Sequence, residues 1–278
     1  MDRARSPNHR TVIRVTVLRL ATYNLLHGHS PQDGSVDMTR LTDAVRSIDA
    51  DVMGLQEVDR LQERSGGTDQ TAAVAEAMGA AYWRFVPALH GTPGPLRDWR
   101  PATEESGAET LGPTYGIALV SRLPVKEWRV LRFDPAPFGL PLMVPATPRP
   151  RLMRVPDEPR AAVASVLAGP AGPLTVVTAH LSFVPGYNMR QLRRIRSWAS
   201  DLPRPLVLMG DLNLPGPLPR RLTGWQSAAQ APTYPSANPK VQFDHVLLDG
   251  LPATAVQRVS VLQLPISDHA ALVVDIEL

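Results

Sequence analysis

The stretch PLVLMGDLNLPG, residues 205–216, carries a run of apolar side chains directly into a polar turn. The run predicts a buried strand, and Asp211 and Asn213 follow it before the chain turns at Pro215. Residues two apart in an extended chain face the same side. We therefore expect Asp211 and Asn213 to project together from a strand end into a loop, where both can face one ligand.

Short apolar runs of the same kind recur along the chain between segments rich in Gly and Pro, and each predicts a strand. The predicted strands cover residues 15–24, 51–58, 81–88, 116–122, 126–133, 160–168, 174–181, 205–213, 243–250, 255–264 and 270–278. So many strands with few helices between them favour an α/β fold in which two sheets pack together and the helices lie outside.

Three segments carry a helical pattern: residues 38–49 behind an Asp37 cap, residues 69–79 behind a Thr68 cap, and residues 188–200. The apolar positions are Met38, Leu41, Val45 and Ile48 in the first helix, and Leu192, Ile195 and Ala199 in the last. These rows predict helices that bury one side against a sheet.

The length of 278 residues favours a single α/β domain over residues 11–278, preceded by a disordered N-terminus at residues 1–10. Residues 87–114 and 134–159 are loaded with Pro and Gly and predict two long loops. Loops of this length are typical of functional lids or of disorder.

Composition excludes several kinds of site. The chain has no cysteine, which removes disulfides, thiolate nucleophiles and Cys-based zinc sites, so a metal would be held by oxygen and imidazole ligands, as Mg²⁺ or Mn²⁺ are. The net charge of +3 does not by itself indicate a nucleic-acid binder. No apolar run is long enough to span a membrane. The N-terminus is basic, but Arg14 and Arg19 interrupt its apolar stretch, whereas a signal peptide needs an unbroken apolar core. We expect a cytoplasmic monomer without an obligate protein partner.

Polar side chains end or border many of the predicted strands. They are Asn24, Glu57, His180, Asp211, Asn213, Asp244, Asp268 and His269. An unpaired charge beside an apolar run costs several kcal/mol, and a single such residue is usually a cap or a turn former. So many drawn from Asn, Asp, Glu and His call for a common cause, and we expect them to converge at one rim of the sheets as a metal site.

The ordered motifs ATYNLLHG, DVMGLQEVD, YGIALVSRLP, TAHL, GDLNLP, FDHVLL and SDHAALV resemble the endonuclease/exonuclease/phosphatase superfamily, the DNase I-like proteins, from about residue 18 to residue 278. The segment TYPSANPKVQFDH resembles its small bacterial hydrolases. The resemblance implies a four-layered α/β sandwich of two mostly antiparallel mixed sheets, with helices outside. It also implies divalent-metal-dependent hydrolysis of a phosphoester, a monoester or a diester, by in-line attack of an activated water.

The resemblance assigns the metal to Glu57, a hard oxygen ligand at a strand end, with Asp268 helping to bind it. Asn24 would bind the metal directly or through water and donate to the phosphate. Without the resemblance, Glu57 reads as a surface glutamate after a buried strand.

The same resemblance places His269 as the general base and Asp244 as the carboxylate that orients its ring. Asp211 would orient or help deprotonate the attacking water. Asn213 and His180 would bind the substrate by donating to phosphoryl oxygens as charge builds.

Tyr115 is a weaker candidate for the same task, since it equally fits a half-buried tyrosine at a strand start, and His27 and Arg160 are weaker still. Leu26 stands where the DNA-repair branch has an acidic residue, which argues against an abasic-site endonuclease. Ile117 stands where many bacterial relatives have Asn, so one phosphate donor is missing.

Rival interpretations remain open. A nucleic-acid substrate could meet the basic cluster RPRLMR at residues 149–154, and an anionic substrate could meet Lys240. A lipid headgroup could meet Trp99 or Phe138, whereas Trp83 fits a strand or core position better. The substrate could also be a phosphorylated small molecule, or the protein could bind a phospho-ligand without catalysis.

Overall fold

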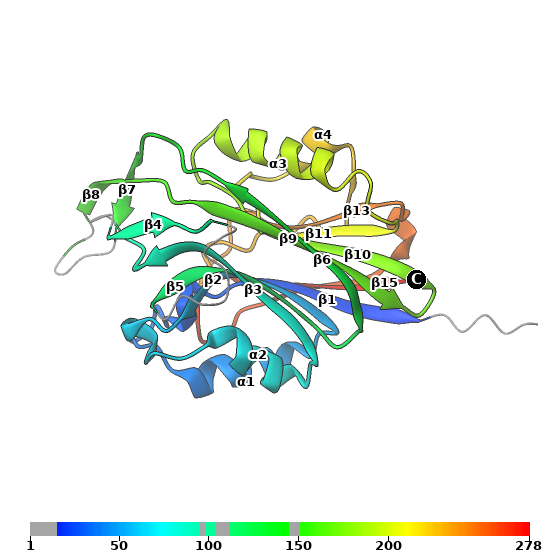
Figure 1. The fold of residues 1–278 in the computed structure, drawn as a ribbon, viewed down its shortest axis with the longest axis horizontal. Helices are drawn as coiled ribbons and strands as arrows, with labels where there is room; N and C mark the ends of the chain where they lie inside the picture. The colour runs from blue at the N-terminus through cyan, green and yellow to red at the C-terminus, as the bar shows by residue number, and fades with distance from the viewer. Residues whose placement is uncertain (1–15, 95–97, 104–111, 145–148, 150) are drawn as a thin grey trace, which may run out of the picture.

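Two large β-sheets pack face to face, and helices cover their outer faces (Figure 1). The computed structural model describes residues 16–94, 98–103, 112–144, 149 and 151–278. Within these residues the fold is the predicted four-layered α/β sandwich, and the prediction of two mixed sheets with helices outside is confirmed.

Each sheet is mostly antiparallel, with a parallel pair at its centre: β1 with β2 in the first sheet and β10 with β11 in the second. The first sheet, in spatial order, contains β14 (Val256–Leu262), β15 (Ala271–Glu277), β1 (Val17–Asn24), β2 (Val52–Arg60), β5 (Thr114–Ser121), β3 (Tyr82–Gly91) and β4 (Trp99–Pro101). The second contains β12 (Gln226–Ser227), β13 (Asp244–Asp249), β11 (Leu206–Asp211), β10 (Gly172–His180), β9 (Arg160–Gly169) and β6 (Val125–Phe133).

The helices divide between the two outer faces. α1 (Met38–Ile48) and α2 (Gln70–Met78) pack on the first sheet, and α3 (Tyr187–Trp198) and α4 (Leu218–Thr223) pack on the second (Figure 1). Asp37 caps α1 as predicted, because its carboxylate accepts from the backbone N–H of Thr39 and Arg40. The predicted Thr68 cap of α2 is wrong: Asp69 accepts from the N–H of Ala72 instead.

Side chains alternate between two cores along each central strand. In β11, Val207 and Met209 join the core between the sheets, whereas Leu206 and Leu208 pack beneath α3 and α4. Leu18 and Leu20 of β1 face the same inner core. This period of two decides which side chains reach the space between the sheets at the strand ends.

The two segments predicted as loops contain strands. Within residues 134–159, β7 (Leu140–Val144) pairs with β8 (Arg151–Val155) as a separate hairpin, and within residues 87–114 β3 continues to Gly91 and β4 follows. The predictions were wrong here because short edge strands tolerate proline, as at Pro141 and Pro101. The predicted disordered N-terminus, residues 1–10, lies outside the described residues.

Two further points concern helices. α4 was not predicted, since the prolines around residues 215–219 obscure its pattern, although proline is well tolerated in a first helical turn. In the described part of the chain, no helix combines the length and the apolarity that crossing a membrane requires.

Candidate active site

Several inward-facing rows of side chains finish with a polar residue at one rim of the sandwich. In β11 the alternation that turns Val207 and Met209 inward turns Asp211 inward next. The same parity turns Asn24 of β1, His180 of β10, Asp244 of β13 and Tyr115 of β5 toward the space between the sheets. The predicted convergence therefore arises from the strand period itself.

The second sheet places three of these groups side by side. His180 lies opposite Asp211 in the parallel β10–β11 pair, and Asp244 lies opposite Asp211 in the antiparallel β11–β13 pair. His180 Nε2 is 3.6 Å from Asp211 Oδ2. One row across three neighbouring strands thus supplies an imidazole and two carboxylates.

Asn24 joins this row to the first sheet. Its Nδ2 donates to Asp211 Oδ2 at 3.1 Å and to Glu57 Oε1 at 3.1 Å, and its Oδ1 accepts from the N–H of Leu26 at 3.0 Å. The side chain is buried. Since both amide hydrogens are engaged, Asn24 holds two carboxylates from different sheets in register rather than offering a free donor to phosphate.

Glu57 owes its position to a break in β2. The pairing of β2 with β5 shifts register between Leu55 and Val58, and Glu57 adopts a left-handed backbone with φ of 56°. A bulge of this kind re-aims a side chain at a strand end, and the positive φ of a non-glycine residue is uncommon. The bulge directs the glutamate toward Asn24.

Behind the site, a polar bridge crosses between the sheets. Gln56 Oε1 accepts from Thr22 Oγ1 at 3.2 Å, and Gln56 Nε2 donates to Thr178 Oγ1 of the second sheet at 3.0 Å. The sheets approach closely here, since a Cβ on Gly54 would lie 2.4 Å from Thr178 Oγ1. These contacts fix the two halves of the site relative to each other.

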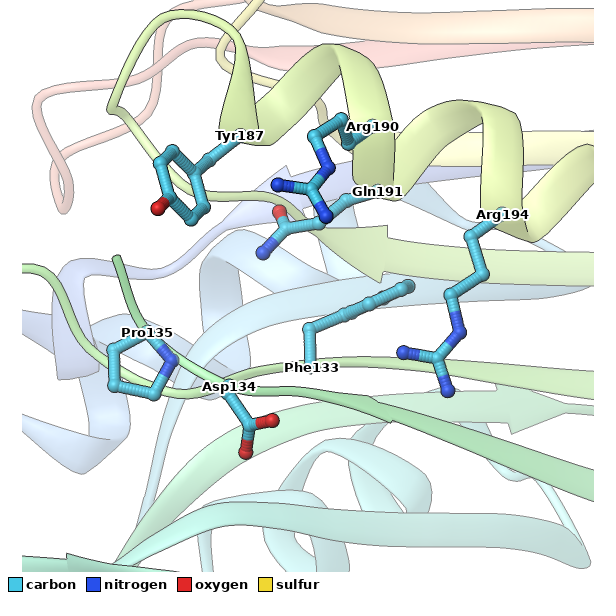
Figure 2. A pocket seen from close by; sticks show the side chains of 7 residues that line it. All are labelled: Phe133, Asp134, Pro135, Tyr187, Arg190, Gln191 and Arg194. Atoms are coloured by element: carbon cyan, nitrogen blue, oxygen red, sulfur yellow. The ribbon is translucent and has the colours of Figure 1, made fainter. Parts of the chain in front are cut away.

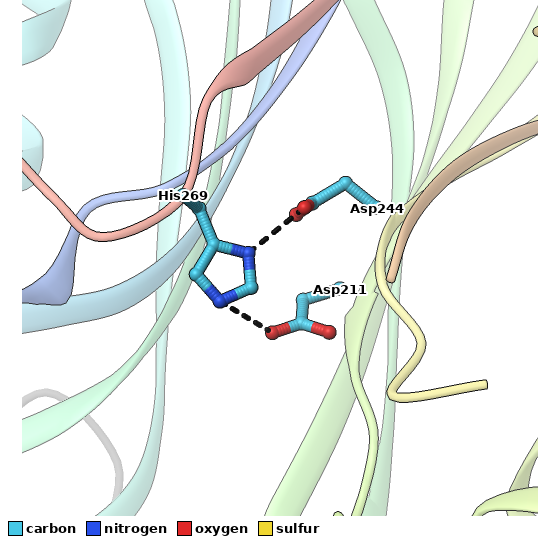
Figure 3. Close-up of side chains that lie close together, drawn as sticks. All are labelled: Asp211, Asp244 and His269. Carbon is cyan, nitrogen blue, oxygen red and sulfur yellow. Dashed lines mark hydrogen bonds and ion pairs between the residues drawn. The ribbon is translucent and has the colours of Figure 1, made fainter. Parts of the chain in front are cut away.

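His269 lies between two carboxylates (Figure 3). Its Nδ1 is 2.8 Å from Asp244 Oδ2, and its Nε2 is 3.8 Å from Asp211 Oδ2. Thr233 Oγ1 also donates to Asp244 Oδ2, at 2.5 Å. Burial opposes a charge on His269, but Asp244 and Asp211 outweigh it and raise the pKa of the imidazole well above its usual range. The two carboxylates therefore favour the imidazolium form of the ring.

Asp211 carries the complementary perturbation. Burial raises the pKa of Asp211 to about 7, and the nearby Asp244 carboxylate acts in the same direction. His269 and the Asn24 amide lower it, but they do not cancel the effect of burial. A carboxyl group whose pKa is raised to near neutral pH is suited to exchanging a proton at physiological pH.

His180 is neutral. An Arg160 Nη1 lies 3.1 Å from His180 Nδ1 and 3.2 Å from Nε2. Burial and the positive charge of Arg160 lower the pKa of His180 well below its usual range. The neutral form of the ring, which this shift favours, can act as a hydrogen-bond donor.

Asn213 departs from the simple alternation. β11 ends at Asp211, and Asn213 has a φ of 49°, so the period of two does not extend to it. Its Nδ2 donates to the carbonyl of Leu181 at 3.0 Å, and its own N–H donates to Asp211 Oδ1 at 3.0 Å. The expectation that Asp211 and Asn213 project side by side from a strand is therefore wrong, although they remain adjacent.

The remaining candidates lie around this centre. Asp268 precedes His269, and burial together with the charge of Glu57 raises its pKa, although His269 acts against this. Tyr115 is buried beneath Arg64, whose Cζ is 5.7 Å from the ring centroid. His27 has a pKa lowered to about 3, first by burial and then by Arg64.

The aromatic and basic residues considered for other substrates are all at least partly exposed. Trp83 is in β3 as expected but is 42% exposed, so it is not a core residue. Trp99 is in β4, and Phe138, at 41% exposure, lies in the segment before β7. Lys240 is exposed.

Sequence reasoning missed Arg64 and Glu158. Arg64 forms a two-pronged ion pair with the buried Asp59, at 2.8 and 2.7 Å, and Glu158 Oε2 is 3.9 Å from Arg160 Nη2. Burial raises the pKa of Glu158, opposed by Arg160. Their proximity to the site cannot be seen in sequence, because Arg64 lies in a turn after β2 and Glu158 in the connection before β9.

An oxygen-seeking divalent cation fits the donors of this rim. The negative charge of Glu57 contributes to the raised pKa of Asp268, and a cation would offset that repulsion. Asp211, Asp244 and His269 also place possible ligand atoms within 4.8 Å of one another. Within that group, however, His269 Nδ1 and Asp244 Oδ2 already share a hydrogen bond, so these two atoms are engaged with each other.

Solved structures share this fold. An endonuclease/exonuclease/phosphatase from Beutenbergia cavernae has 22% identity and a TM-score of 0.64, covering 94% of this chain and 72% of that chain. Sphingomyelinase C from Streptomyces griseocarneus has 17% identity and a TM-score of 0.58, over 94% and 98% of the two chains. Mannosyl-6-phosphatase from Bacteroides thetaiotaomicron has 15% identity and a TM-score of 0.57, over 92% and 98%.

At these identities the likeness establishes the fold alone, and none of the curated proteins compared with the chain matches it. The sequence profile of the Endonuclease/Exonuclease/phosphatase family matches residues 21–269, which include every polar residue of the rim described above. This chain therefore belongs to the endonuclease/exonuclease/phosphatase family.

Proposed function

We propose that this protein hydrolyses phosphoesters with a divalent metal ion, through in-line attack of an activated water. Members of its family are generally phosphoester hydrolases that use divalent metals. The observation that carries the proposal is the contact of Asn24 with Glu57 of one sheet and Asp211 of the other. That contact sets the metal-ligand candidate next to the carboxyl group suited to activate water.

Glu57 and Asp268 would hold the cation, and Asn24 would keep the Glu57 carboxylate in place. Mg²⁺ or Mn²⁺ suits carboxylate oxygens and takes few protein ligands directly. When bound, the ion would offset negative charge on the phosphoryl oxygens as the transition state develops.

The proton-accepting role falls to Asp211 rather than to His269, the base suggested by sequence. Asp244 and Asp211 raise the pKa of His269 and so favour its charged form, which has no lone pair to accept a proton. Asp211, with its raised pKa, accepts the proton from water, and the His269 imidazolium stabilises the charge that builds opposite it. Asp244 keeps the ring charged and oriented through Nδ1.

The phosphoryl oxygens would be met by hydrogen-bond donors on the same rim. His180 offers a neutral ring N–H, and Arg160, buried against it, offers positive charge. Asn213 Nδ2 carries a second hydrogen besides the one given to Leu181. Tyr115, with its pKa raised by burial, keeps its hydroxyl proton and can donate as well.

A direct test measures hydrolysis of bis(p-nitrophenyl) phosphate and p-nitrophenyl phosphate with Mg²⁺, with Mn²⁺ and with EDTA. We expect metal-dependent turnover of at least one ester, and strong loss in Asp211→Asn and His269→Ala. Turnover that is absent with every metal, together with retained binding of phosphate, would instead support a protein that only binds phospho-ligands.

For the substrate, we propose a phosphorylated small molecule such as a sugar phosphate or a lipid headgroup. Two structural neighbours are named as a mannosyl-6-phosphatase and a sphingomyelinase. Nucleic acid is a second candidate, because Arg149, Arg151 and Arg154 are exposed on the hairpin whose strand β8 leads into Arg160. Nicking of supercoiled plasmid that weakens steeply with salt would favour it.

A further inference from the structure

Helix α3 carries a polar stripe that faces a cavity, and none of the residues lining this cavity belongs to the candidate active site. Tyr187, Arg190, Gln191 and Arg194 are three or four residues apart and so share one side of the helix. Figure 2 shows them lining a cavity of about 300 Å³ opposite Phe133, Asp134 and Pro135. We call this cavity the α3 cleft.

The two arginines of the cleft have no paired carboxylate among the described residues. Arg190 and Arg194 are exposed and lie one helical turn apart, an arrangement of like charges that destabilises a helix. Helix α3, YNMRQLRRIRSW, contains no acidic residue, and neither arginine pairs with a carboxylate among the described residues. Asp134 lines the cleft, but its carboxylate is directed away from α3 (Figure 2).

Both guanidinium groups are supported by aromatic rings. Arg190 Cζ lies 5.8 Å from the centroid of Tyr187, and Arg194 Cζ lies 5.6 Å from the centroid of Phe133. Stacking of this kind keeps an arginine ordered while its N–H groups stay available. The cleft therefore presents two preorganised donors.

Gln191 gives an independent indication of a ligand. The side chain is 95% buried, and its Oε1 accepts from the N–H of Ser182 at 2.8 Å, which fixes the orientation of the amide. Its buried Nε2 has no acceptor among the described residues. Buried donors are nearly always paired, so this amide calls for an acceptor that the described chain does not supply.

We propose that the α3 cleft is a second anion site, which binds a phosphate group with Arg190, Arg194 and the Gln191 amide. Paired guanidinium groups are the preferred protein partners of phosphate, and an amide donor completes the set. The site is separate from the catalytic rim, although Ser182, which holds Gln191, is two residues from His180 and donates to Asp157 at 2.8 Å.

The phosphate could belong to a free anion or to a second phosphate of the substrate. The two sources share the same chemistry at the cleft and differ in their effect on catalysis. Binding to the cleft does not require the proposed hydrolase activity, so the binding test below stands even if that activity fails.

The test compares Arg190→Ala/Arg194→Ala with Arg193→Ala/Arg196→Ala, which removes the same charge from exposed positions of the same helix outside the cleft. Calorimetric titration with inorganic phosphate is done in EDTA. We expect the wild type and the Arg193/Arg196 variant to bind alike, and the Arg190/Arg194 variant to lose at least tenfold in affinity. Equal affinity of all three proteins would overturn the proposal.

A second variant tests the role of Gln191 itself. Gln191→Glu keeps an oxygen to accept from Ser182 but replaces the unpaired donor by a negative group, and we expect it to lose phosphate binding as well. Retained binding in this variant would overturn the role of Gln191.

Kinetics then separate the sources. If the anion is part of the substrate, KM for fructose 1,6-bisphosphate rises about tenfold in the Arg190/Arg194 variant, while KM for p-nitrophenyl phosphate is unchanged. If it is a free anion, both KM values stay as in the wild type although phosphate binding is lost.

Discussion

Replacing Asn24 by alanine removes the amide that connects the carboxylates of the two sheets. In the wild type its Nδ2 donates to Asp211 Oδ2 and Glu57 Oε1, each at 3.1 Å. A donor stabilises the ionised carboxylate and so lowers its pKa, which is the effect of Asn24 on Asp211. Without it the pKa of Asp211 rises further, and more of the carboxyl group is already protonated at a given pH.

The size of the effect follows from the strength of the lost contact. A hydrogen bond to a charged group contributes about 1.5–3 kcal/mol, and one pKa unit corresponds to about 1.4 kcal/mol. Asn24 and Asp211 are 1% and 2% exposed, so only water entering the vacated space can replace the donor. We therefore take the lower end and expect the pKa of Asp211 to rise by about one unit.

The assay is the pH dependence of kcat/KM for bis(p-nitrophenyl) phosphate at saturating Mg²⁺. We expect the acidic limb to move to higher pH by about one unit in Asn24→Ala, with about a tenfold lower rate on that limb. Asn188→Ala is the control, since Asn188 is equally buried but donates to the carbonyl of Asn213 and contacts neither carboxylate. A profile for Asn24→Ala that superimposes on the wild type, or moves to lower pH, would refute the reasoning.

Three further perturbations test the site and the fold. In Asp244→Asn the ring of His269 loses its facing carboxylate, so we expect its pKa, followed by NMR, to fall and kcat to drop about 100-fold; an unchanged ring titration would contradict the pairing. In the folded state Asp211 keeps its proton up to about pH 7, whereas the unfolded chain releases it near pH 4. Between these two pH values the wild type therefore loses stability as pH rises, whereas Asp211→Asn does not. The free energy of unfolding of the variant, measured in urea, should therefore increase relative to that of the wild type over this range. A constant difference would count against the raised pKa. In Gly54→Ala the new Cβ would lie 2.4 Å from Thr178 Oγ1, and we expect about 1–3 kcal/mol of lost stability, whereas Gly112→Ala, with nothing within 4 Å, should change little.

Sequence was sufficient for the features that repeat with a fixed period. Val207, Met209 and Asp211 occupy alternate positions, so the inward direction of the carboxylate follows from the apolar residues before it. The same holds for Asn24 after Leu18 and Leu20. The arrangement of two mostly antiparallel mixed sheets came with the family resemblance rather than from these patterns, and the order of the strands was not predicted.

Features that break a period could not be predicted. The bulge at Glu57 and the left-handed backbone of Asn213 depend on pairing with other strands, which sequence does not display. Protonation is a further case, because the raised pKa of His269 results from carboxylates that lie 58 and 25 residues away along the chain. A motif can suggest an imidazole at a site, but only the surroundings decide whether it carries a charge.

The bridge from Thr22 through Gln56 to Thr178 has a consequence for how this enzyme family can diversify. Because the groups of the candidate site are shared between two independently hydrogen-bonded sheets, a shift of one sheet along the other by a single residue would displace its groups by about 3.3 Å relative to those of the other sheet. The bridge opposes such a shift, because its hydrogen bonds join side chains of the two sheets. In such a frame, differences in the bound ligand would be accommodated by the connections beyond the rim, while the central strands keep their positions.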